Sequence, residues 1–254
     1  MTPAVRTQGL AKRFGSHWAV RGIDLEVPRG SFAGLVGPNG AGKTTTLSMV
    51  TGLLRPDAGL AAVDGHDVWH DPVGVKARIG VLPEGLRLFE RLSGRELLVY
   101  TGRLRRLPAP DVEQRTRELL EVMDLTADAD KLVVDYSTGM RKKIGLAAAL
   151  LHNPAVLFLD EPFEGIDPIS ANILQAVLAR FTTTGGTVVF SSHVMELVER
   201  LCDWVTVIAQ GQIVAQGRTA DVRGGRSLNE AFIALVGGDR HPGEGLAWLG
   251  SSSD

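Results

Sequence analysis

The sequence predicts a mixed α/β fold in which a mostly parallel sheet forms the core, an antiparallel β subdomain comes first, and a helical subdomain is inserted. Three features of its 254 residues indicate this. Residues 5–36 contain short apolar runs separated by Gly-containing turns, which is typical of antiparallel strands. Residues 84–151 carry Leu, Arg and Glu at helical spacing. In the remainder, short strands alternate with helices, which predicts parallel strands joined by helical crossovers.

Each expected element rests on a local signal. We expect strands at 5–9, 19–27, 32–36, 59–63, 79–82, 155–159, 187–190, 204–208 and 213–215. We expect helices at 43–53, 95–104, 111–123, 168–182, 195–201 and 227–236. Gly52 and Pro56 end the first helix, and Pro108-Ala109-Pro110 separates two helices of the inserted subdomain. The apolar run 155–159 is short enough for a strand buried on both faces, and Gln210-Gly211 predicts a hairpin turn.

The sequence divides into one domain and a tail. We expect residues 1–238 to form the domain, with a helical subdomain at about 84–151. Residues 239–254 are rich in Gly and Ser, and we expect them to be flexible. Glycine accounts for 30 of the 254 residues without a regular period, which excludes collagen-like repeats.

Composition and charge exclude several classes of protein. The hydrophobic share of 44% is enough to offset the entropy of ordering, so most of the chain is not disordered. The net charge of −2 gives no basic footprint, so we expect no nucleic-acid partner. Cys202 has no second cysteine to pair with, which favours a reducing compartment. Because no apolar run approaches the roughly 18 residues of a spanning helix and no secretory signal is seen, we expect a soluble, cytoplasmic protein.

A phosphate-binding loop is predicted between an expected strand and an expected helix. Residues 37–44 (Gly-Pro-Asn-Gly-Ala-Gly-Lys-Thr) fit the P-loop pattern G-x-x-x-x-G-K-[ST]. Backbone N–H groups and the helix N-terminus bind phosphate oxygens there, Lys43 reaches the β- and γ-phosphates, and the Thr44 hydroxyl ligates Mg²⁺. A chance Gly-rich turn is the alternative, which the flanking strand and helix disfavour. The predicted binding residues are Gly37, Pro38, Asn39, Gly40, Ala41, Gly42, Lys43, Thr44 and Thr45.

Two adjacent acids follow the apolar strand at 155–159. In open α/β sheets, ligands bind beyond the carboxyl ends of the strands, so Asp160 and Glu161 are expected beside the phosphates. Asp160 is expected to hold Mg²⁺ through water, and Glu161 to orient and deprotonate the attacking water. Acids at a strand end are often only solvent-facing, but the P-loop upstream favours the functional interpretation.

These motifs, in this order, resemble those of the nucleotide-binding subunit of an ATP-binding cassette (ABC) transporter. The resemblance covers roughly residues 5–238. It places Phe14, in Ala11-Lys12-Arg13-Phe14-Gly15, where the family has an aromatic side chain that stacks on adenine. A single Phe is otherwise more often part of a hydrophobic core, so this role depends on the resemblance.

Two positions depart from the family pattern. Glu84, in Leu82-Pro83-Glu84-Gly85, stands where most members have glutamine, and it is either a direct Mg²⁺ ligand or only a hinge. The family signature, usually Leu-Ser-Gly-Gly-Gln, reads Tyr-Ser-Thr-Gly-Met at 136–140, followed by a helix with basic residues 141–143 in its first turn. The resemblance implies that the signature contacts a γ-phosphate across a dimer interface, although a serine N-cap is common at any helix. The implied contact residues are Ser137, Thr138, Gly139 and Met140.

Two further residues match the family after the acidic pair. Gly165-Ile166-Asp167-Pro168 matches the loop through which the two subunits communicate, so Asp167 is expected at their interface. His193, in Phe190-Ser191-Ser192-His193, matches the histidine that contacts the γ-phosphate from a strand end. A single histidine is usually structural, and this role again depends on the spacing and the resemblance. The remaining histidines do not cluster at metal-ligand spacing, so we predict none of them as ligands.

The resemblance implies an ATPase that powers transport. Two subunits, expected to be a homodimer, would face head to tail with ATP and Mg²⁺ between them, and Glu161, His193 and Lys43 would be catalytic. The helical subdomain would dock on a separate transmembrane permease through apolar positions that are equally compatible with core packing: Leu86, Leu88, Phe89 and Leu92.

The variant signature is most similar to ATPases of bacterial exporters, so we expect export, from the cytoplasmic side of the cell membrane, with a cargo that the sequence does not identify. Alternatives are two different cassettes in the dimer, a non-transport member of the family that acts on ribosomes or nucleic acid, and a kinase that shares only the P-loop.

Overall fold

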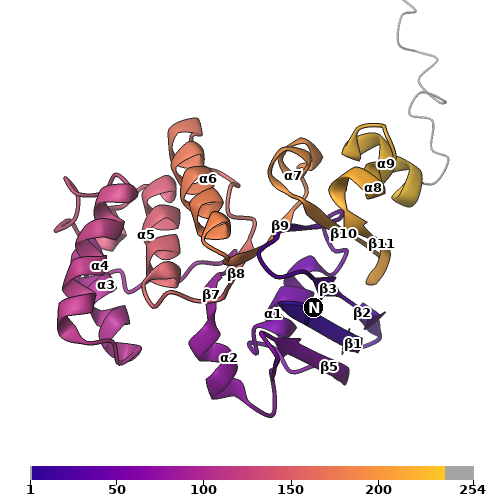
Figure 1. The fold of residues 1–254 in the computed structure, drawn as a ribbon, viewed down its shortest axis with the longest axis horizontal. Coiled ribbons are helices and arrows are strands. Elements are labelled where there is room, and N and C mark those ends of the chain that lie inside the picture. The colour runs from indigo at the N-terminus through magenta and orange to yellow at the C-terminus, as the bar shows by residue number, and fades with distance from the viewer. Residues whose placement is uncertain (1, 238–254) are drawn as a thin grey trace, which may run out of the picture.

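The computed structural model describes residues 2–237, and it contains two sheets with helices packed around them (Figure 1). The strands are β1 (Val5–Phe14), β2 (His17–Ile23), β3 (Glu26–Val27), β4 (Phe32–Val36), β5 (Ala58–Val63), β6 (His66–Asp67), β7 (Ile79–Leu82), β8 (Val156–Asp160), β9 (Thr187–Ser192), β10 (Trp204–Ala209) and β11 (Gln212–Arg218). The helices are α1 (Lys43–Val50), α2 (Pro72–Arg78), α3 (Gly94–Leu104), α4 (Ala109–Val122), the 3₁₀ turn Val133–Asp135, α5 (Thr138–Leu150), α6 (Pro168–Thr183), α7 (Met195–Leu201), α8 (Thr219–Arg223) and α9 (Leu228–Val236).

The larger sheet has the order β11-β10-β4-β9-β8-β7. Its strands pair in parallel from β10 to β7, and only the hairpin partner β11 runs antiparallel. The smaller sheet is antiparallel, with the order β2-β1-β5-β6 and with β3 paired to β1. This arrangement confirms the predicted fold class.

The larger sheet is covered on both faces, and the side chains of β8 show how. Leu157 and Leu159 pack into a core that contains residues of α3, α5 and α6, whereas Val156 and Phe158 pack into a second core shared with α1 and the smaller sheet. Alternate residues of a strand point to opposite faces. The next residue in this register, Asp160, therefore faces the side of α1.

Helices α3, α4 and α5 lie together at one end of the molecule, on the left of Figure 1. Tyr136, just before α5, ties this group together: its buried hydroxyl donates a hydrogen bond of 2.8 Å to the Asp128 carbonyl and lies against Gly94 at the start of α3. A Cβ at Gly94 would come within 2.1 Å of that hydroxyl, so any larger residue there would have to displace the Tyr136 ring.

Several boundaries differ from expectation for local physical reasons. The first strand was expected to end at residue 9 but continues to Phe14, because irregular pairing around Leu10/Ala11 and Lys12/Arg13 absorbs the break at Gly9. Helix α4 begins at Ala109 rather than after Pro110, since a proline in the first turn loses no hydrogen bond.

Two helices, α2 and α8, were not expected. Helix α2 carries a readable start signal, because Asp71 caps its N-terminus and Pro72 follows as its first residue. The predicted tail, residues 239–254, lies outside the described residues. Within 2–237, no helix combines the length and apolar character needed to cross a membrane.

Candidate functional site

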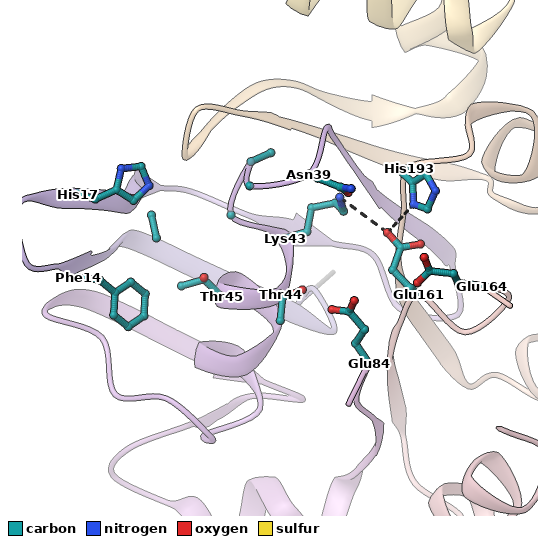
Figure 2. Close-up of a pocket in the computed structure, with 14 residues that line it drawn as sticks. Phe14, His17, Asn39, Lys43, Thr44, Thr45, Glu84, Glu161, Glu164 and His193 are labelled. Carbon is teal, nitrogen blue, oxygen red and sulfur yellow. Dashed lines mark hydrogen bonds and ion pairs between the residues drawn. The ribbon is translucent and has the colours of Figure 1, made fainter. Parts of the chain in front are cut away.

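A pocket of about 410 Å³ opens where the carboxyl ends of β4, β8 and β9 meet the turn between β1 and β2 (Figure 2). The sheet register brings these strand ends to one level: Val36 pairs with Ser192, and Asp160 pairs with Ser191. The segments that follow the three strands therefore lie side by side. The pocket is lined by Phe14, His17, Ala19, Asn39, Gly40, Ala41, Gly42, Lys43, Thr44, Thr45, Glu84, Glu161, Glu164 and His193.

The loop after β4 is shaped by close backbone approaches. A Cβ at Gly37 would come within 2.2 Å of the Ile208 carbonyl oxygen, and one at Gly42 within 2.5 Å of the Ala19 carbonyl oxygen. Gly42 also has a φ of 107°, which L side chains rarely adopt. The two glycines thus let the loop pack against β10 and β2, with α1 starting directly behind it.

Lys43 is almost fully buried, at 7% exposure, on the floor of the pocket. Its Nζ donates hydrogen bonds to the carbonyls of Gly37 at 2.8 Å and Pro38 at 3.3 Å. It also lies 3.8 Å from Oε1 of Glu161. The loop's own carbonyls therefore hold the ammonium group against the loop that was predicted to bind phosphate.

Glu161 lies between two other candidate groups, as the dashed lines of Figure 2 show. Its Oε1 is 3.8 Å from Lys43 Nζ and 3.1 Å from His193 Nδ1. Its backbone is left-handed, with φ 44°, a conformation that is costly for a residue with a side chain. The Glu161 N–H donates to Ser191 Oγ at 2.9 Å, and that hydroxyl donates in turn to Asp160 Oδ1. A carboxylate held in this way can accept a proton from a water molecule in the pocket.

Asp160 does not line the pocket but lies beside it. It is buried on the face that the strand register predicts, and it borders a small neighbouring cavity together with Ser48 of α1 and Thr51, which directly follows that helix. Glu84, after β7, does line the pocket, and in Figure 2 its carboxylate points toward Thr44 and Glu161.

The remaining predicted residues lie away from this pocket. Ser137 is exposed and caps α5, accepting a hydrogen bond of 3.2 Å from the Met140 N–H. Asp167 is exposed and caps α6, accepting one of 2.9 Å from the Ser170 N–H. Its hydrogen bonds with Ser170 lower the pKa of the Asp167 carboxyl. A Cβ at Gly139 would come within 2.7 Å of Ser170 Oγ and 3.0 Å of Asp167 Oδ2, so the starts of α5 and α6 pack directly together.

The three basic residues after the signature were expected in the first turn of a helix, and the structure corrects this for two of them. Because α5 begins at Thr138, Arg141 completes its first turn, whereas Lys142 and Lys143 fall in the second. Arg141 pairs with Glu90 at 3.0 Å, and Lys143 donates to the Asp124 carbonyl at 3.2 Å. Both side chains thus bind groups of their own subunit.

Sequence reasoning missed three residues that line the pocket, namely His17, Ala19 and Glu164. His17 had a usable signal: the two-residue turn Gly15-Ser16 makes it the cross-strand partner of Phe14. Glu164 had none, because its place depends on how the chain turns after Glu161. Its N–H donates to the Glu161 carbonyl at 3.3 Å.

The chain is similar to known proteins in both sequence and structure. The family model described as ABC transporter matches residues 20–164. A daunorubicin/doxorubicin resistance ATP-binding protein of Streptomyces peucetius is 39% identical over 92% of this chain and 71% of its own length. A Nod factor export ATP-binding protein of Ralstonia nicotianae is 39% identical over 85% of this chain and 68% of its own. A solved structure of an ATP-binding subunit of an ABC transporter superimposes with a TM-score of 0.85 at 27% identity, covering 91% of this chain and 99% of that one.

Proposed function

This chain belongs to the ABC transporter family, and on that premise we propose that it is the ATPase subunit of an exporter whose membrane-spanning permease is a separate chain. Like its family, it binds ATP and hydrolyses it to power transport. The observation that carries the proposal is the convergence of Lys43, Glu161 and His193 in one pocket above the P-loop. The outward direction is supported by two relatives, whose names describe drug resistance and Nod factor export.

We propose that ATP lies along the length of this pocket. Phe14, 51% exposed at one end, is placed to stack on adenine. The loop N–H groups and Lys43 would bind the phosphates, and Glu161 at the other end would take the proton of the attacking water while His193 orients its carboxylate. The buried environment of Lys43 and Glu161 strengthens these electrostatic contacts.

We propose that Mg²⁺ is held by the Thr44 hydroxyl and the Glu84 carboxylate, which line the pocket, and through water by Asp160, which lies beside it. Hydroxyl and carboxylate oxygens are the ligands that Mg²⁺ prefers, and this ion is usually bound together with substrate phosphates. The described residues contain no group of three or more His, Cys, Asp or Glu side chains placed to hold a metal by themselves. When bound, the ion would neutralise charge on the β- and γ-phosphates.

We propose that two copies of this chain close head to tail over ATP. Ser137 and Thr138 of the signature and Asp167 are exposed together at the starts of α5 and α6, where the buried Gly139 joins the two helices, outside the pocket of their own chain. The N-terminus of α5 can bind a phosphate group, because its first N–H groups lack helical partners. A second cassette would supply this surface to each pocket.

We propose that the permease docks in a groove at the end of the molecule that contains α3, α4 and α5. The groove lies beside α3, and it is lined by Leu86, Arg87, Leu88, Phe89, Glu90, Arg91, Leu92, Tyr100 and Arg141. The exposed rings of Phe89 and Tyr100 pack edge to face at 5.1 Å. An exposed aromatic pair of this kind is typical of an interaction site, and it would place the subunit at the cytoplasmic face of the membrane.

Replacing Phe14 with Ala is expected to weaken ATP binding. Loss of base stacking corresponds to about 1–3 kcal/mol, so the Kd for ATP should rise roughly 5- to 150-fold in isothermal titration calorimetry. Trp18→Ala is the matched control, because this exposed ring lies against Arg13 and does not line the pocket. An unchanged Kd in Phe14→Ala would assign this side chain no contact with the base.

Replacing Phe89 with Glu is expected to release the protein from membranes without changing its own ATPase rate. Phe89 is 55% exposed, so the substitution puts a charge on the apolar part of the groove without disturbing the core. The P-loop pocket does not contain Phe89 and stays intact. We would express the tagged chain in its native host and measure its share in the membrane fraction. Val73→Glu, at an exposed apolar position on α2, is the control. Equal membrane shares for both variants would contradict the proposed docking surface.

A further inference from the structure

Lys142 makes contacts that none of the predicted roles uses. It lies in the second turn of α5, and its Nζ donates hydrogen bonds of 2.6 Å each to the carbonyls of Glu161 and Glu164. Partial burial lowers the pKa of Lys142, and the carboxylates of Glu164, Glu161 and Glu84 oppose that shift. One side chain of the signature helix thus binds the turn that carries the candidate general base.

The contact matters because the backbone of Glu161 is in an unfavourable conformation. A left-handed φ of 44° persists only where the surroundings hold it. The N–H of Glu161 is bound by Ser191 Oγ, and its C=O is bound by Lys142 Nζ. The peptide groups on both sides of this residue are therefore fixed by side chains from β9 and α5. The direction in which the carboxylate points, toward Lys43 and His193, depends on that backbone.

Helix α5 also begins with the signature. Ser137 caps the helix and Lys142 lies little more than one turn further along, so the two move as parts of one rigid element. If the signature contacts the γ-phosphate of the partner's ATP, as the proposed function has it, a shift of α5 on closure is passed directly to the Glu161–Glu164 turn.

We propose that Lys142 is a positioning residue that couples the signature helix to Glu161. This proposal rests on the proposed function. It requires that α5 contacts the nucleotide bound by the partner subunit, and that Lys142 then aligns Glu161, the general base of its own subunit. The lysine touches no substrate. It acts through the two carbonyls that it binds.

The test compares hydrolysis and binding in Lys142→Met. We expect kcat to fall roughly 10- to 100-fold, because a displaced catalytic group costs about that much, while the Kd for ATP stays within about twofold of wild type. Lys142→Arg, which can still donate to two carbonyls, should recover most of the rate. Lys143→Met is the matched control: this neighbouring buried lysine binds the Asp124 carbonyl, outside the pocket, and its loss should lower the melting temperature but not kcat.

A double-variant cycle separates positioning from general damage. If Lys142 acts through Glu161, Lys142→Met should slow single-turnover hydrolysis in the wild-type background and have little further effect in the Glu161→Gln background. Equal slowing in both backgrounds would overturn the proposal. So would a wild-type kcat in Lys142→Met.

Misfolding of the variant and failure of the proposed function can both be distinguished from failure of this proposal. Should Lys142→Met not fold, Lys142→Gln, which remains polar but is too short to reach both carbonyls, takes its place with the same expected loss of kcat. A wild-type chain that binds ATP but does not hydrolyse it, alone or as a dimer, would contradict the proposed function rather than the role of Lys142.

Discussion

Glu161→Gln is expected to slow ATP hydrolysis on the order of 10²- to 10⁴-fold, which is the usual contribution of a general base. Glutamine keeps the shape of the side chain and can still hydrogen-bond to His193, but it cannot accept the proton of the attacking water. It also removes a negative charge that lies 3.8 Å from Lys43, so ATP binding should be retained or become tighter. Phosphate release and calorimetry measure the two effects separately. Glu113→Gln, an exposed residue of α4, is the control for the loss of one carboxylate.

The same variant tests the shared site. With hydrolysis blocked, ATP without Mg²⁺ should convert the Glu161→Gln protein from monomer to dimer, measured by size-exclusion chromatography with light scattering. A shift that depends on ATP supports two identical cassettes joined by nucleotide. A protein that binds ATP and remains monomeric would count against a homodimer, and it would indicate a different partner cassette or closure only on the permease.

Lys43→Met is expected to cost most of the affinity for ATP. The ammonium group would exchange its bonds to the Gly37 and Pro38 carbonyls for charge-assisted bonds to phosphate, each worth about 1.5–3 kcal/mol. Losing even one such bond raises the Kd roughly 10- to 150-fold. The substitution also leaves Glu161 without its buried cation, which adds repulsion toward the triphosphate.

Calorimetric titration with ATP, without and with Mg²⁺, measures this loss. Lys76→Met is the matched control, because it removes the same charge from an exposed position of α2. An affinity close to wild type in Lys43→Met would mean that phosphates do not bind at this loop. Circular dichroism melting of both variants separates a binding defect from unfolding.

Although it missed helices α2 and α8, the sequence alone determined most of the elements, the fold class and the motifs. These depend on neighbouring residues: alternation and apolar runs select strands, Gly and Pro end helices, and the P-loop pattern lies within eight consecutive residues, 37–44. The rule that ligands bind beyond the carboxyl ends of strands also predicted Asp160 and Glu161 near the loop; Glu161 lines the pocket, and Asp160 lies beside it.

Only the tertiary structure decided how distant residues meet. The pairing register of β4, β9 and β8 aligns the carboxyl ends of these strands, which brings Lys43, His193 and Glu161 close together. This register cannot be predicted from neighbouring residues in the sequence. The packing of α5 against the turn after β8 decides three further features. It brings Lys142 within hydrogen-bond distance of the Glu161 and Glu164 carbonyls, it supports the left-handed backbone of Glu161, and it positions Glu164. Local patterns are read from adjacent residues, whereas these contacts are fixed by the order of strands in a sheet and by which helix covers it.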